Sequence, residues 1–133
     1  MPITSLFAGL LSLLFIALSV LVIVRCYQTK TAVGAGADDQ MQRRIRAHAN
    51  FAEYTPLVLL LMALCETAGS SGALLQALGA AFVAGRISHA YSMVFHEPRH
   101  GRILFRQIGM VITFSVLGIF ALMALSHGLH AGH

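Results

Sequence analysis

The chain has 133 residues, of which 57% are hydrophobic and only 11% charged, and its formal net charge at pH 7 is +4. Soluble globular domains are about 45–50% apolar and about 25% charged, so this composition indicates a membrane protein and the length allows one domain, residues 1–133. The basic residues gather at the ends of apolar segments and form no basic face interleaved with aromatics, which argues against nucleic-acid binding.

Four apolar segments are predicted to be helices that cross the membrane, which makes the expected fold an all-α, four-helix bundle. The first contains 22 residues without a charge, Ile3 to Val24, and that length spans about 30 Å of hydrocarbon. No basic residue precedes it, so a retained helix is favoured over a secretory signal peptide. The four predicted helices cover residues 3–25, 41–67, 73–95 and 107–125.

The connections between these helices differ in charge. The first connection contains a glycine-rich stretch followed by Asp38 and Asp39, either of which is a candidate cap for the next helix. Residues 96–106 are predicted to form a second basic loop. Because Lys and Arg gather at the first and third connections, we expect these loops to be cytoplasmic and both termini to lie outside.

Polar residues at helical spacing mark one face of the second helix. Arg43, Arg46, Asn50 and Glu53 follow one another at steps of three, four and three, and Tyr54 adjoins them. A charge in hydrocarbon costs several kcal/mol, so we expect this stripe to point into the bundle and to find partners there. A pocket for a polar, zwitterionic ligand is favoured, and a purely structural pairing of Glu53 with an arginine is the alternative.

The third helix has a similar pattern, with Arg86, His89 and Met93 at steps of three and four. Arg86 is a candidate counter-ion for Glu53. A single histidine such as His89 more often serves as an interhelical hydrogen-bonding residue than as a catalytic base.

Residues 43–57, RRIRAHANFAEYTPL, resemble the signature of the MAPEG family, membrane-associated proteins in eicosanoid and glutathione metabolism. That signature is loosely R-x-x-R-A-(H/Q)-x-N-x-x-E-(Y/N)-x-P. Residues 85–91, GRISHAY, are similar to the third helix of microsomal glutathione transferases and their bacterial relatives. With four spans and a long first loop, the resemblance covers essentially the whole chain.

The resemblance implies a homotrimer in a bacterial inner membrane, with glutathione sites between subunits near the cytoplasmic helix ends. The implied activity is conjugation of the glutathione thiolate to lipophilic electrophiles that arrive from the lipid, with reduction of hydroperoxides as a further outcome. The resemblance matches Glu53 to the glutathione ammonium and Arg46 to one of the glutathione carboxylates. The residues that it assigns to glutathione binding are Arg25, Arg46, His48, Asn50, Glu53, Tyr54, Arg86 and His89.

Activation of the thiol is assigned, by the same resemblance, to an arginine that a neighbouring subunit contributes near the start of its fourth helix. Arg102 matches this position best, and Arg106 and Arg99 are the alternatives. The family often has tyrosines at the positions of His89 and Met93, a departure that makes an eicosanoid-synthesising role improbable.

Two other functions stay open at this point. A non-catalytic, lipid- or partner-binding member of the same fold has the same sequence features. A small multidrug exporter also has four helices, but its essential carboxylate lies in the first helix, which here has none.

No metal site is predicted. The cysteines Cys26 and Cys65 are far apart and lack metal-ligand spacing. His127, His130 and His133 stand at steps of three, but they are expected in a solvated tail.

Overall fold

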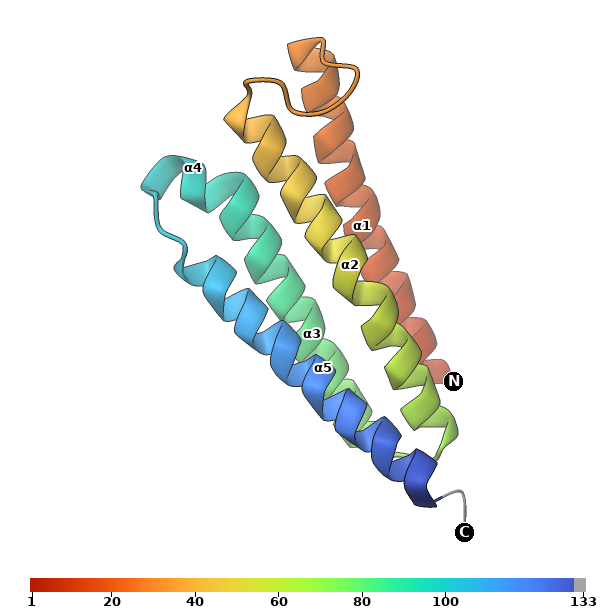
Figure 1. Ribbon diagram of the computed structural model, residues 1–133. Helices are drawn as coiled ribbons and strands as arrows, with labels where there is room; N and C mark the ends of the chain where they lie inside the picture. The colour runs from red at the N-terminus through yellow and green to blue at the C-terminus, as the bar shows by residue number, and fades with distance from the viewer. Residues whose placement is uncertain (131–133) are drawn as a thin grey trace.

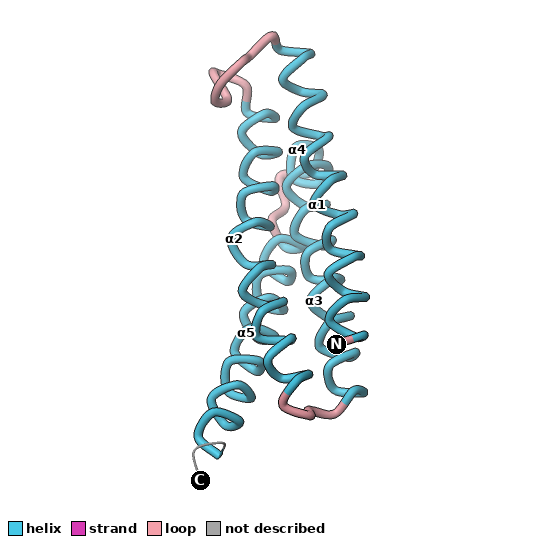
Figure 2. The backbone as a smooth tube through the Cα atoms, turned by 90° about the vertical axis from the view of Figure 1, so that its right-hand side faces the viewer, coloured by secondary structure: helices cyan, strands magenta, loops and turns pink. Residues whose placement is uncertain are grey.

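The computed structural model describes residues 1–130, with Glu97 and Pro98 described by their backbone alone. Within this range four long helices run side by side, and successive long helices are antiparallel (Figures 1 and 2). The helical elements are α1 (Pro2–Thr29), α2 (Asp39–Thr67), α3 (Gly72–Tyr91), a π-helix (Ser92–His96), α4 (Glu97–His100) and α5 (Leu104–His130). The connections 30–38 and 101–103 lie at one end of the bundle, and both ends of the described chain lie at the other (Figure 1).

The predicted basic loop at residues 96–106 is largely helical, and this prediction is wrong. The third helix continues as the π-helix and one further turn, α4, so that residues 101–103 alone separate it from α5. Proline has no backbone N–H to donate to the preceding turn, and the helix widens just before Pro98. The chain then reverses at Gly101, whose φ of 64° is readily adopted by glycine.

The predicted tail is helical as far as the described residues reach, although His130 is exposed as expected. α5 continues to His130, and the His127 Nε2 atom lies 2.8 Å from the Ser70 hydroxyl in the α2–α3 turn. This hydrogen bond joins the end of α5 to the neighbouring connection. His133 lies outside the described residues.

Three of the described helices, α1, α2 and α5, are long and apolar enough to cross a membrane. α3 has 20 residues, and Gln76, Arg86 and His89 lower its mean hydropathy. Its membrane crossing therefore stays a prediction, although it runs along α5 within the bundle (Figure 2). Large apolar side chains such as Leu13, Val111 and Leu122 cover the outside, as expected for a surface that faces lipid.

α3 and α5 approach so closely that glycine is required at their contact. A Cβ added to Gly109 would lie 2.6 Å from the carbonyl oxygen of Gly85 and 2.8 Å from the backbone nitrogen of His89. Both neighbours are backbone atoms, which cannot rotate away. The contact therefore fixes the distance between the two helices beside His89.

At the end of the bundle where α1 begins, a carboxylate of α2 binds the first turn of α1. Glu66, near the end of α2, accepts hydrogen bonds from the backbone N–H groups of Ile3 and Thr4, at 3.0 and 2.8 Å, and from the Thr4 hydroxyl. The first N–H groups of a helix have no partner within it, and an anion there also interacts favourably with the helix dipole. α2 thus caps the start of α1.

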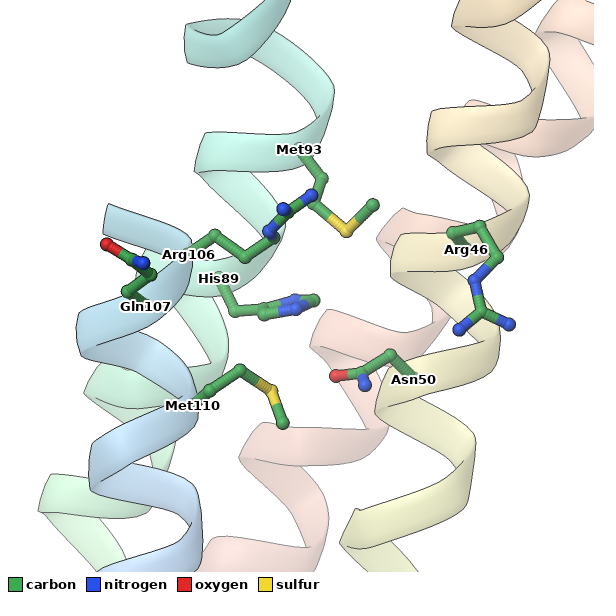
Figure 3. Close-up of a pocket in the computed structure, with 7 residues that line it drawn as sticks. All are labelled: Arg46, Asn50, His89, Met93, Arg106, Gln107 and Met110. Carbon is green, nitrogen blue, oxygen red and sulfur yellow. The ribbon is translucent and has the colours of Figure 1, made fainter. Parts of the chain in front are cut away.

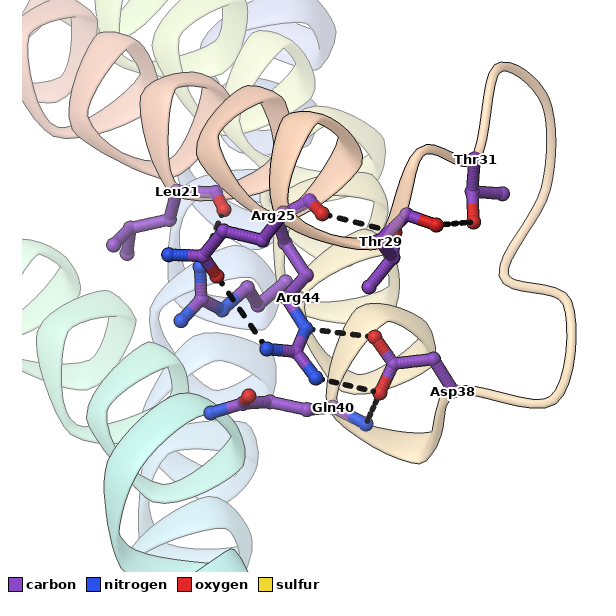
Figure 4. Close-up of polar contacts among 8 residues, drawn as sticks. Leu21, Arg25, Thr29, Thr31, Asp38, Gln40 and Arg44 are labelled. Atoms are coloured by element: carbon purple, nitrogen blue, oxygen red, sulfur yellow. Dashed lines mark hydrogen bonds and ion pairs between the residues drawn. The ribbon is translucent and has the colours of Figure 1, made fainter.

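Arginines connect α1 and α2 near the first connection (Figure 4). Asp38 caps α2 by accepting from the backbone N–H of Gln40, and it accepts two hydrogen bonds from Arg25, at 2.7 and 3.1 Å. The predicted cap is confirmed for Asp38. Arg44 reaches from α2 to the carbonyl oxygen of Leu21 on α1, at 2.7 Å.

The Asp38 cap gives a pH-dependent prediction. Hydrogen bonding from Arg25 holds the pKa of the Asp38 carboxyl below its ordinary value. A lowered folded-state pKa means that the stabilisation is present above the unfolded pKa, near 3.9, and is lost as the pH falls through the folded pKa. Asp38→Asn should therefore lower the unfolding temperature of the detergent-solubilised protein at about pH 6, and this difference should shrink as the pH falls below the unfolded pKa of about 3.9.

Asp39→Asn is the matched control, because the Asp39 side chain is 75% exposed and, among the described side chains, pairs with Arg43 one turn along the same helix. Such exposed pairs contribute little, so this variant should unfold like the parent chain. An equal loss in both variants would show that the bridge to α1 does not stabilise the fold.

The α3–α5 contact gives a second prediction. Gly109→Ala should destabilise the bundle by about 1–3 kcal/mol, because the helices must separate to admit the methyl group. Gly118→Ala on the same helix is the control, since nothing lies within 4 Å of its added Cβ. Thermal unfolding in detergent measures both, and the contact is not limiting if the two variants behave alike.

Candidate functional site

A cavity of about 320 Å³ opens between α2, the end of α3 and the start of α5 (Figure 3). Its lining residues belong to the start of α2, the end of the α3–π-helix segment and the start of α5, so it lies in the half of the bundle nearer the connections 30–38 and 101–103. The lining residues are Arg46, Asn50, His89, Met93, Arg106, Gln107 and Met110. Each helix contributes a pair of residues four positions apart, which places the pair on one helical face.

Arg86 is buried directly behind this cavity, with 1% of its surface exposed. Its Nη1 atom donates to the side-chain oxygen of Asn50 at 2.8 Å and to the Asn50 backbone oxygen at 3.3 Å. Its Nη2 atom lies 3.8 Å from the Met110 sulfur, and the rings of Tyr54 and Phe82 lie about 6 Å from the guanidinium carbon. The Arg86 guanidinium is thus stabilised by the two Asn50 oxygens, the Met110 sulfur and two aromatic rings.

No carboxylate of the described side chains pairs with Arg86, and its Nε atom is buried without a hydrogen-bond partner. A buried charge without an opposite charge is costly unless something compensates it. The same guanidinium also fixes Asn50, because the amide oxygen accepts from Arg86 and the amide nitrogen is the donor left for the cavity.

Two further arginines, Arg46 and Arg106, are among the residues that line the cavity. The described lining contains no acidic side chain, whereas it contains the amides of Asn50 and Gln107 and the buried imidazole of His89, which is 4% exposed. Cations and N–H donors around a partly enclosed space favour an anionic ligand.

The structure brings some of the predicted binding residues together. Arg46, Asn50 and His89 line the cavity, and Arg86 supports them from behind. Tyr54 lies next to Arg86 and packs edge-on against Phe114 of α5. These predicted residues come from two helices, α2 and α3, so their meeting depends on the tertiary packing.

Other predicted residues lie elsewhere. His48 faces α1, where it stacks on Phe15 with ring centroids 4.5 Å apart and pairs with the Ser19 hydroxyl at 3.0 Å. Arg25 pairs with Asp38 at the first connection. Neither residue lines the cavity.

The expectation that the whole polar stripe is buried and paired inside the bundle is wrong for Glu53. Its side chain is exposed on α2, and in the described part of the chain no hydrogen bond or ion pair joins it to Arg46 or Arg86. Arg46 is also exposed, although it lines the cavity. Arg86 pairs instead with Asn50.

The three candidate activating arginines occupy different places. Arg106 lines the cavity. Arg102 lies in a separate surface depression with His96 and His100, and Arg99 is exposed. Within one chain, only Arg106 of the three is a lining residue of the cavity, so activation by Arg102 would need a neighbouring subunit.

Gln107 and Met110 were not singled out from the sequence. For Met110 the signal that was available is its position four residues after Arg106, which places both on one helical face. Gln107 directly follows Arg106, and this spacing does not single it out. A sequence alone does not show which face of an apolar helix points inward.

Comparison with known proteins agrees with the sequence motif and the fold. Residues 4–126 match the MAPEG family. The chain is 32% identical over 123 residues to the inner membrane protein YecN of Escherichia coli strain K12, across 92% of this chain and 90% of that protein. The protein of the same name from Escherichia coli O6:H1 matches to the same extent. This chain is an integral membrane protein that belongs to the MAPEG family.

Proposed function

We propose that the chain is a glutathione-dependent membrane transferase and that glutathione binds in the cavity between α2, α3 and α5. The observation that carries this proposal is the set of three guanidinium groups, Arg46, Arg86 and Arg106, in and behind a cavity with no described acidic side chain. Glutathione has two carboxylates and one ammonium, so it supplies net negative charge, and its thiolate form supplies more. MAPEG membership supports this ligand class.

In the proposed complex, Arg46 binds a carboxylate and the Asn50 amide nitrogen donates to a carbonyl or carboxylate oxygen. Glu53 is assigned to the ammonium, and since it is exposed on α2 it would act in a site shared with a second copy. An unpaired carboxylate facing lipid costs several kcal/mol, which supports a subunit contact along this face of α2 and is compatible with a homotrimer.

The proposed chemical step begins with the glutathione thiol. A free thiol has a pKa near 8.5, so lowering it by about two units requires roughly 2.7 kcal/mol of preferential stabilisation of the anion. One arginine in a partly desolvated site supplies an energy of this order. We assign this role to Arg106, because its guanidinium lines the cavity.

The thiolate sulfur then attacks an electrophilic carbon of a lipophilic substrate. A carbon–sulfur bond forms, and the leaving group, chloride in a chloronitroaromatic, departs with its bonding electrons. A hydroperoxide would instead be reduced to an alcohol and water while two glutathione molecules become the disulfide. Turnover assays with both substrate classes distinguish these outcomes.

The proposed location is the inner membrane, supported by the similarity to an inner membrane protein. The two basic connections lie at one end of the bundle and both ends of the described chain at the other (Figure 1). This arrangement supports a cytoplasmic cavity mouth with both termini outside.

Glutathione binding is tested first. Arg46→Gln should weaken binding by about 10–100-fold, the loss expected for one charge-assisted hydrogen bond. Isothermal titration calorimetry of the detergent-solubilised protein gives affinity and stoichiometry. Lys30→Gln, an equal charge change on an exposed residue of the first connection, is the control and should bind like the parent chain. Unchanged binding in Arg46→Gln would remove glutathione from this cavity.

Activation is tested separately by the ultraviolet absorbance of bound thiolate and by turnover of a chloronitroaromatic. Arg106→Gln should reduce the thiolate signal at pH 7 by about 10–30-fold, because a free thiol stays a few per cent ionised, and turnover by about 10–100-fold. Arg102→Gln should keep both if the lining residue activates the thiol. The reverse result would assign activation to Arg102 of a neighbouring subunit. Glutathione binding without thiolate or turnover in the parent chain would favour a non-catalytic member of the family.

A further inference from the structure

A second basic cluster lies outside the cavity, where α3 connects to α5. His96 ends the π-helix and His100 ends α4, and their rings lie 4.8 Å apart. With Arg102, just after the reversal at Gly101, they line a surface depression of about 370 Å³. None of these three residues lines the first cavity.

The described side chains that line the depression favour an anion over a metal ion. Two imidazoles at this separation could chelate a metal ion, but the described residues contain no group of three His, Cys, Asp or Glu side chains that could complete a site. The guanidinium of Arg102 shares the depression, and Arg99 is exposed on the same turn. Both would repel a cation, whereas imidazole N–H and guanidinium groups together bind phosphate oxygens well.

The surroundings indicate the molecule that carries the phosphate. Exposed apolar and aromatic side chains border the cluster on both helices, namely Tyr91, Phe95, Ile103, Leu104 and Phe105. The Phe105 ring packs edge-on against the His96 ring, with centroids 4.9 Å apart. Aromatic residues next to basic ones are typical of the level where headgroups meet acyl chains. A soluble anion such as inorganic phosphate would make no favourable contact with these exposed apolar side chains, whereas the acyl chains of a lipid would.

We propose that His96, His100 and Arg102 form a binding site for the phosphate headgroup of an anionic phospholipid, whose acyl chains lie along Phe105 and Leu104. In the proposed site the phosphate oxygens accept hydrogen bonds from the imidazole and guanidinium groups, and free inorganic phosphate has the same chemistry. The site is distinct from the proposed glutathione cavity, and its occupancy by lipid does not depend on glutathione.

Native mass spectrometry of the full chain released from detergent measures this binding. Phosphatidic acid should be retained in preference to phosphatidylcholine with the same acyl chains. Arg102→Gln should weaken phosphatidic acid binding about fivefold, the size expected for one basic residue near a charged membrane surface. Arg99→Gln removes the same charge three residues away but outside the depression, and it should bind like the parent chain.

Equal weakening in Arg102→Gln and Arg99→Gln would overturn the proposal, because it would indicate attraction to net charge alone. Equal retention of phosphatidylcholine would also overturn it. Displacement of the lipid by equimolar inorganic phosphate would identify free phosphate as the ligand in place of the lipid. His100→Ala provides an independent variant, and circular dichroism confirms that each variant is folded before it is compared.

Discussion

The buried guanidinium of Arg86 is the constraint on which the site depends. It lies in an apolar bundle without a described carboxylate partner, so its charge must be met by dipoles and polarisable groups from other helices. Asn50 on α2 and Met110 on α5 supply two of these contacts. If either helix moved away, the Arg86 guanidinium would lose one of the contacts that stabilise its buried charge. One side chain of α3 thus fixes the positions of the two helices that line the cavity.

The close approach of Gly85 and Gly109 completes this constraint. With no Cβ on either residue, α5 comes near enough for Met110 to reach Arg86 and for Arg106, one turn earlier, to line the cavity beside His89. A larger residue at the crossing would widen the gap on which both contacts depend. The arrangement of the polar residues around the cavity therefore depends on the close contact between Gly85 and Gly109.

Much of the fold follows from hydropathy and spacing, because hydrocarbon obliges the backbone to satisfy its hydrogen bonds within helices. The same spacing placed Arg46 and Asn50 on one face, as observed. The partner of Arg86 was not predictable, since a periodic pattern within α2 does not say whether Asn50 or Glu53 will face a residue of α3. The path between α3 and α5 was also missed, because helical turns around Pro98 depend on local backbone geometry that basic composition does not reveal.

The separation of Arg106 from Arg102 shows why position along the chain does not reveal which arginine lines the cavity. The two residues are four apart, a spacing that would place them on one face of a continuous helix. Arg102 instead precedes the start of α5, just after a reversal at Gly101, and lines its depression with His96 of the π-helix and His100 of α4. The helix boundary thus divides the basic residues into two groups, one facing the interior between helices and one facing the outer surface. A chain with few charges thus separates its arginines into two places that differ in solvent access, the cavity between the helices and the depression at the surface.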